Sequence, residues 1–199
     1  MSNTPTAFED NAQEFNDYLS SLFTETITAH PLQPIIRPNI AYITFEGARS
    51  FRDSPSVELD NGCRIRISQT ILPNPEVPSG VTTKKYVYAY ALGADPRRDW
   101  LVRYDYAPDA LTNHPAAHVH FNGISDTYNS FLNAEEKPLR DVHFPTDRIT
   151  VEDFIEHLVR EYDVPTRRGK KAALRFLAER RREFHEQHRT RRAPYDVPE

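Results

Sequence analysis

The sequence predicts an α+β domain, an antiparallel β-meander of four to six strands packed with an N-terminal helix and one or two C-terminal helices. Apolar residues recur at helical spacing near the N-terminus, and segments of alternating polar and apolar residues follow one another through the middle of the chain. An amphipathic helical pattern returns after residue 150. Short connections between neighbouring strands favour antiparallel pairing, because parallel strands need long crossovers.

The chain has 199 residues, which is enough for one domain with a core. We expect a single α+β domain over residues 1–165, followed by a basic helix and tail over residues 166–199. No run of about 18 apolar residues occurs, so we expect no membrane span, and the N-terminus lacks a signal-peptide pattern. A single cysteine, Cys63, excludes an internal disulfide and a cysteine-based zinc cluster. Together these features favour a cytoplasmic protein.

The first predicted element is an amphipathic helix over residues 8–23, where apolar side chains recur at helical spacing. Three prolines between residues 31 and 38 then predict irregular structure until about Asn39. The short apolar run IAYITFEG, residues 40–47, is predicted to be a strand.

The meander is predicted to begin with a hairpin over residues 57–72. Its two arms flank Asp60-Asn61-Gly62, and Asn and Gly tolerate the positive φ angles of a tight turn. The next strand is predicted over residues 84–92, where three tyrosines share one face. Such a ladder is more typical of a core face than of a base-stacking platform. The tyrosines are Tyr86, Tyr88 and Tyr90.

Two further strands are predicted over residues 100–108 and 116–121. Successive side chains of a strand point to opposite faces, so Trp100 is expected on the same face as Tyr104. The other face is polar in both strands. If the two strands pair, a guanidinium, a carboxylate and two imidazoles lie on one side of the sheet. These polar residues are Arg103, Asp105, His118 and His120.

A second amphipathic helix is predicted over residues 150–162. Thr150 and Asp153 have the spacing of a capping box at its start, and Pro165 ends the apolar pattern. We expect this helix to cover a face of the sheet. A third, basic amphipathic helix is predicted near residues 167–192.

The formal net charge of -4 conceals a strong asymmetry. Residues 160–192 contain 12 Lys or Arg against 5 Asp or Glu, whereas the rest of the chain contains 13 against 24. Such segregation is typical of an anion-binding arm. A solvated helix face, or pairing with the protein's own acidic body, explains it equally well. The candidate nucleic-acid-binding residues are Arg167, Arg168, Lys170, Lys171, Arg175, Arg181 and Arg182.

The segment HPAAHVHFNG, residues 114–123, holds three of the eight histidines. His118 and His120 on one strand would place two rings on one face, with Cβ atoms about 6.5–7 Å apart, which suits two metal ligands. Zinc requires three or four ligands, and no third residue stands at a fixed spacing. The candidates for it are His114, His143, Asp105 and Asp141. We therefore predict no metal and no other cofactor, and keep a metal-dependent hydrolase as a lesser alternative.

Metal-independent RNA cleavage would use the same side chains differently. It needs a base for the 2′-hydroxyl, an acid for the leaving 5′-oxygen and a cation for the charged intermediate. Histidine suits the first two roles because its pKa lies near neutrality, and arginine suits the third because its planar fork pairs with phosphate oxygens. The alternative is ordinary surface histidines beside an ion pair worth up to about 1 kcal/mol. The candidate catalytic residues are His118, His120, Arg103, Asp105 and His114.

The middle of the chain resembles the TumE family of small bacterial and archaeal proteins found in toxin–antitoxin pairs. The resemblance covers about residues 57–121, in the series VELDNGCRIRI, KKYVYAYAL, WLVRYDYAPD and HPAAHVH. In that family a strand ending in an RYD-x-APH-like motif is followed shortly by a histidine cluster. The matching residues are Arg103, Tyr104, Asp105, Ala107 and Pro108, then His114, His118 and His120.

The resemblance implies a toxin-like component of a toxin–antitoxin or defence system, kept harmless by a cognate antitoxin or another partner protein. The first hypothesis is therefore a metal-independent endoribonuclease. His118 and His120 would be its acid–base pair, with Arg103 as the phosphate clamp and Asp105 orienting a histidine. The basic helix would hold the RNA backbone. The alternative is a non-catalytic module that binds nucleic acid or a partner protein through its helices.

Overall fold

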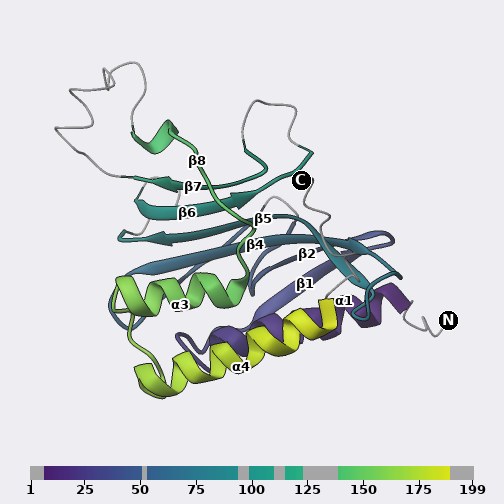
Figure 1. The fold of residues 1–199 in the computed structure, drawn as a ribbon, viewed down its shortest axis with the longest axis horizontal. Coiled ribbons are helices and arrows are strands. Elements are labelled where there is room, and N and C mark those ends of the chain that lie inside the picture. Colours follow the sequence, from purple (N-terminus) through teal and green to yellow (C-terminus); the bar gives the residue numbers. More distant parts are fainter. Residues whose placement is uncertain (1–6, 51–52, 94–98, 110–114, 123–138, 189–199) are drawn as a thin grey trace, which may run out of the picture.

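The computed structural model describes residues 7–50, 53–93, 99–109, 115–122 and 139–188. Within this part of the chain, an eight-stranded antiparallel sheet is packed with three α-helices (Figure 1). The strand order is β1-β2-β4-β5-β6-β7-β8, and β3 pairs with the remaining length of β4. The α+β prediction is confirmed, with more strands than expected.

The elements follow the chain in a simple order. They are α1 (Ala7–Thr24), β1 (Leu32–Arg37), β2 (Ile40–Phe45), β3 (Ser56–Glu58), β4 (Arg64–Pro73), β5 (Val81–Ala91), β6 (Trp100–Tyr106), β7 (Ala117–Phe121), the 3-10 turn η1 (Leu139–Asp141), β8 (Phe144–Pro145), α3 (Val151–Glu161) and α4 (Lys170–His188). Among the described residues, no helix has the length and apolar character needed to cross a membrane.

The expectation of irregular structure before Asn39 is wrong, because Leu32–Arg37 forms strand β1. Pro34 lies opposite Ile43 of β2. Proline lacks an N–H group and is therefore tolerated on an edge strand, where one side of the backbone has no partner strand. Since β1 stands at the end of the strand order, its proline is compatible with the sheet.

The helices cover the face of the sheet that carries the tyrosines, which we call the helix face. The ring centroid of Phe154 from α3 lies 5.6 Å from the ring centroid of Tyr88 and 6.2 Å from that of Tyr104. Tyr86 stacks on Tyr88 with ring centroids 4.3 Å apart. The tyrosine ladder is therefore part of the core, as its alternation predicted.

The predicted capping box at the start of α3 is confirmed. The Thr150 hydroxyl accepts a hydrogen bond from the Asp153 backbone N–H at 3.2 Å, and the Thr150 backbone N–H donates to the Asp153 carboxylate at 2.9 Å. The apolar stripe that follows is buried against the sheet. Its buried members are Val151, Phe154, Ile155, Leu158 and Val159.

Trp100 lies on the opposite face from the one that simple alternation predicted. Tyr90 pairs with Val102 and Ala91 pairs with Trp100, so Leu101 is an extra residue in β6. This β-bulge inserts one residue into the alternation and reverses the face of the residues before it. The Trp100 ring therefore joins the face away from the helices.

Candidate functional site

Strands β6 and β7 bring four polar side chains together on the face opposite the helices, which we call the histidine face. Arg103 pairs in register with His120, and Asp105 pairs with His118. In the antiparallel ladder, directly opposite residues point to the same side. The arrangement follows from the period-two alternation of both strands, and it is the one expected from the sequence.

Asp105 is the centre of this group. Its Oδ2 lies 3.8 Å from Nε2 of His118 and 3.5 Å from Nε2 of His120. The Arg103 guanidinium donates to the same carboxylate through Nε, at 3.1 and 3.0 Å, and through a terminal nitrogen at 2.9 Å. A planar guanidinium held in this way fixes the orientation of the carboxylate.

The charge state of Asp105 follows from these contacts. Burial raises the pKa of its carboxyl group, but the hydrogen bond from His120 and the Arg103 charge together outweigh burial, and the pKa is lowered overall. Asp105 is therefore a carboxylate at neutral pH. A carboxylate at this position stabilises a positive charge on either neighbouring imidazole.

The tautomer of His118 is set by the chain just before β7. Its Nδ1 lies 2.7 Å from the carbonyl oxygen of Pro115, and since a carbonyl only accepts, Nδ1 carries the proton. In the neutral ring, Nε2 is then the basic nitrogen, and it points toward Asp105. A backbone carbonyl that fixes one nitrogen in this way is typical of histidines that act through the other one.

A third imidazole, that of His143, completes the cluster. Its ring centroid lies 4.8 Å from that of His118 and 4.4 Å from that of His120. The pairing of Val119 with Phe144 brings the chain across β7 directly after His143. The ligand atoms of the three histidines all lie within 4.8 Å of one another. We call these three residues the histidine triad.

From the residue pattern alone, His143 is only one candidate ligand among four, because nothing in that pattern predicts strand β8. A two-residue strand is too short to show alternation, and Pro145 lies within it. The position of His143 follows only from the register between β7 and β8. Val119 pairs with Phe144, so continuing the antiparallel ladder by one residue places His143 opposite His120.

Trp100 is the second residue of the site that the sequence did not place correctly. The Arg103 guanidinium carbon lies 5.1 Å from its ring centroid, a cation–π distance. The ring of His120 lies nearly perpendicular to the Trp100 ring, with centroids 6.2 Å apart. Trp100 is the only tryptophan of the chain, so its fluorescence reports on this cluster.

The alternative of ordinary surface histidines is wrong for His118 and His120. His118 is 7% exposed and His120 is 2% exposed, whereas the side chains of Arg103 and Asp105 are 28% and 18% exposed. The helices do not cause this burial, since they pack on the other face. A molecule approaching from solvent therefore meets the Arg103–Asp105 pair before it meets the imidazoles.

Two other candidates remain, and only one of them can be placed. His114 lies outside the described residues. Asp141 is exposed in η1 and is not one of the residues whose ligand atoms converge. Among the three described candidates for a third metal ligand, His143 is therefore the one that joins His118 and His120, and Asp105 is a neighbour.

The predicted nucleic-acid-binding residues lie far from the histidines. Figure 1 shows α4 beside α1, at the opposite end of the sheet from β7, and Phe184 of α4 stacks on Tyr18 of α1. A nucleic acid held along α4 would therefore not lie directly across the histidine triad.

Most of these cations face groups of the protein itself. Three of them form ion pairs with acidic side chains: Arg168 with Glu25, Lys170 with Asp163 at 2.8 Å, and Arg175 with Glu179 at 4.0 Å.

Two more cations contact other helices. Arg181 pairs with Asp153 at 3.0 Å and also contacts Glu156, both of α3. Arg167 donates to the Thr24 carbonyl. Lys171 and Arg182 are exposed. Self-pairing is the interpretation that these contacts favour, and nucleic-acid binding by α4 stays a prediction.

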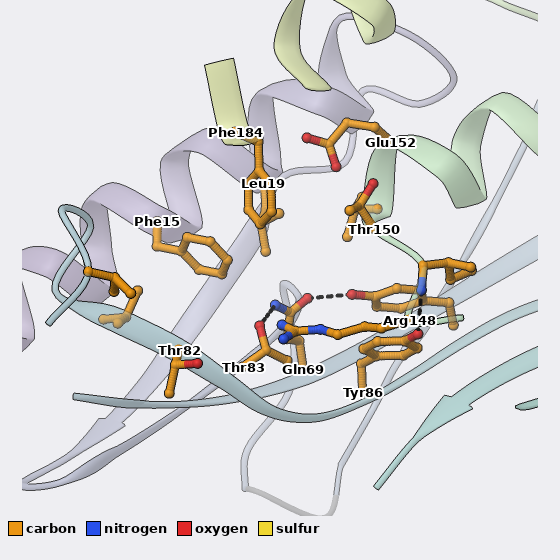
Figure 2. A pocket seen from close by; sticks show the side chains of 15 residues that line it. Phe15, Leu19, Gln69, Thr82, Thr83, Tyr86, Arg148, Thr150, Glu152 and Phe184 are labelled. Carbon is orange, nitrogen blue, oxygen red and sulfur yellow. Dashed lines mark hydrogen bonds between the residues drawn. The ribbon is translucent and has the colours of Figure 1, made fainter. Parts of the chain in front are cut away.

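A separate cavity of about 220 Å³ lies on the helix face, between α1, β5, α3 and the end of α4 (Figure 2). Gln69 donates to the Thr83 hydroxyl at 2.8 Å and accepts from the Tyr88 hydroxyl at 2.6 Å. The Ile149 N–H donates to the Tyr86 oxygen at 3.0 Å. Because these polar groups already bind one another, we assign the cavity to packing of the helix face.

Comparison with known protein families identifies a relationship. The model of a protein family described as Toxin TumE matches residues 37–162. The matched segment runs from the end of β1 to the residue after α3, and it contains the polar cluster of β6 and β7 together with His143. No curated protein and no solved structure matches the chain significantly.

Proposed function

Because this chain belongs to the TumE family of toxins, we propose that it is the toxin of a toxin–antitoxin pair and that it cleaves RNA at the cluster on its histidine face. Family membership supports a toxin and, with it, a cognate antitoxin partner. The chemistry rests on a single observation. A guanidinium, a carboxylate and two imidazoles converge across β6 and β7, with Asp105 within 3.8 Å of both His118 and His120.

Each side chain has a role in this proposal. One imidazole removes the proton of the 2′-hydroxyl and the other protonates the leaving 5′-oxygen, a division that contributes about 10²–10⁴-fold per group. Nε2 of His118 is suited to accept a proton because its Nδ1 is fixed by Pro115. Asp105 stabilises the imidazolium that forms, and Arg103 holds the phosphate.

Access to the imidazoles is the main structural demand of the proposal. Arg103 and Asp105 are partly exposed, but His118 and His120 are buried. The segment from η1 to β8 lies against β7, and its His143 packs on both rings. Cleavage therefore requires that this segment move aside when RNA binds.

The proposal is tested by expressing the protein from an inducible promoter and following growth and total RNA. The wild type is expected to arrest growth and degrade RNA, and the double variant His118→Ala, His120→Ala is expected to lose both effects. Purified double variant should cleave RNA at least about 100-fold more slowly. His30→Ala is the matched control, because His30 is an exposed histidine in the connection between α1 and β1.

Folding must be checked in parallel, since two buried side chains are removed. Circular dichroism and a thermal melt should show that the double variant keeps its secondary structure. A folded double variant that still cleaves RNA at the wild-type rate would end the ribonuclease proposal. Loss of toxicity only when residues 166–199 are deleted would instead favour a non-catalytic module that acts through α4.

A further inference from the structure

The histidine triad brings three imidazole nitrogens to one buried point, and this convergence is not needed for an acid–base pair. We propose that His118, His120 and His143 bind one transition-metal ion, with Zn²⁺ as the best-suited ion. The inference goes beyond the proposed ribonuclease activity and does not depend on it, because it rests only on the positions of the three rings.

The distances allow a metal ion with small side-chain movements. The ligand atoms lie within 4.8 Å of one another, so a point exists that is no more than about 2.8 Å from all three, whereas Zn–N bonds measure about 2.0–2.1 Å. Each nitrogen therefore has to move inward by less than about 1 Å. Rotation of the imidazole about its side-chain bonds provides movements of this size.

The surroundings resemble those of catalytic zinc sites. Such sites use three protein ligands and leave the fourth position to water or substrate. The ligands are held by hydrogen bonds from their other nitrogen, and His118 has such a bond to the Pro115 carbonyl. Asp105, fixed by Arg103, lies 3.5–3.8 Å from two of the rings. It is placed to accept a hydrogen bond from a water in the fourth position.

The donor set selects the kind of ion. Three imidazole nitrogens favour zinc, copper or nickel, while magnesium and calcium prefer sets of oxygen ligands. Burial of His118 and His120 keeps competing water away from the metal–nitrogen bonds. A bound ion would supply a Lewis acid and a water of lowered pKa.

The nitrogens of His118 and His120 can either coordinate a metal ion or transfer protons, but not both at once. A coordinated imidazole cannot accept a proton at its coordinating atom, so metal-free acid–base cleavage and metal binding exclude each other in one molecule. His143 distinguishes the two, because it is a ligand in the metal site and has no role in the acid–base pair. Variants of His143 therefore test the metal proposal alone.

The experiment uses the full chain, freed of metal by a chelator and then dialysed. Zn²⁺ is titrated by calorimetry, and bound zinc is measured by elemental analysis after gel filtration. We expect one equivalent of zinc per chain, with at least about 100-fold weaker binding for both His143→Ala and His143→Gln. Co²⁺ provides a spectroscopic check. It should give the visible absorption of a four-coordinate site and should quench the fluorescence of Trp100, whose ring contacts His120.

The matched control is Asp141→Ala, which removes a possible ligand from the same segment but outside the histidine triad. It should bind zinc as the wild type does. The proposal is overturned if the folded wild type binds less than about 0.2 equivalents at micromolar zinc, or if His143→Gln binds as tightly as the wild type. RNA cleavage is measured separately, so a protein that binds zinc without cleaving RNA contradicts only the proposed function.

Discussion

The two faces of strands β5 to β7 use the same backbone for different purposes. On the helix face, Tyr88 and Tyr104 pack against Phe154 of α3. On the histidine face, the neighbours of Tyr104 in sequence, Arg103 and Asp105, form a bidentate ion pair beside two imidazoles. Because alternate residues of a strand point to opposite sides, one seven-residue strand supplies both the core and the candidate site.

The electrostatics of the two faces also differ. Burial raises the pKa of Tyr88 well above its usual value and raises that of Tyr86 to about 12, so these phenols stay neutral. The pKa of Asp105 is lowered instead, because His120 and Arg103 outweigh its burial. Burial on the helix face therefore involves neutral rings, whereas on the histidine face it involves an ionised group with charged or polar partners. Stability should depend mainly on the first face and chemistry on the second.

The largest expected effect comes from removing Phe154. This residue is fully buried and contacts the rings of both Tyr88 and Tyr104, so Phe154→Ala should lower the free energy of unfolding by about 3–5 kcal/mol. The measurement is urea denaturation followed by circular dichroism. Phe144→Ala is the control, because Phe144 is 38% exposed, and it should cost less than about 1 kcal/mol. Equal losses for the two variants would contradict the comparison.

A smaller loss of stability, with a large loss of activity, is expected for Asp105→Asn. The change leaves the Arg103 guanidinium without its carboxylate in a partly buried position and should cost about 1–3 kcal/mol. RNA cleavage and toxicity should both fall. Asp109→Asn is the matched control, since Asp109 forms an exposed ion pair with Lys84. If Asp105→Asn cleaves RNA at the wild-type rate, Asp105 does not support the imidazoles.

The alternation that separates the faces could be predicted from sequence, but its interruptions could not. The tyrosines of β5 and the polar residues of β6 and β7 follow a strict period of two, and the structure places them accordingly. Alternation alone predicts the wrong face for Trp100, because the bulge at Leu101 has no signal in the residue types. Bulges depend on how two strands pair, which is a property of both strands together.

Contacts between segments far apart in the chain are the second kind of feature that the sequence pattern does not predict. His143 reaches His118 and His120 across a connection of more than twenty residues, through a two-residue strand that has no periodicity of its own. The burial of the histidines also depends on the tertiary arrangement, because the residues of β7 alone predict an exposed polar face. The helices were easier to predict, since the apolar stripe of α3 and its capping box are local features of the sequence.

A pH dependence is expected on the helix face, where Glu152 is fully buried and contacts the Tyr18 hydroxyl. Burial raises the pKa of Glu152, and the hydrogen bond from Tyr18 only partly opposes this. The folded state then holds a proton that the unfolded state releases, so stability falls as the pH rises from the ordinary glutamate pKa through the raised one. Glu152→Gln should reduce this slope, measured as unfolding free energy against pH. An unchanged slope would show that Glu152 is ionised in the folded state.

The smallest effect is expected for Arg181, whose change tests whether the basic helix stabilises the fold or binds RNA. Arg181 lies 3.0 Å from Asp153 and also contacts Glu156, and its side chain is 28% exposed. Arg181→Met keeps most of the apolar stem and should cost about 1 kcal/mol or less, decreasing with added salt. Lys171→Met is the control, because Lys171 is exposed near the start of the same helix, and it should leave stability unchanged within about 0.5 kcal/mol. RNA affinity measured at two salt concentrations completes the test. If α4 follows an RNA backbone, Lys171→Met should weaken RNA binding and reduce its salt dependence. If α4 only packs on α3, Arg181→Met should lower stability and Lys171→Met should leave RNA affinity unchanged.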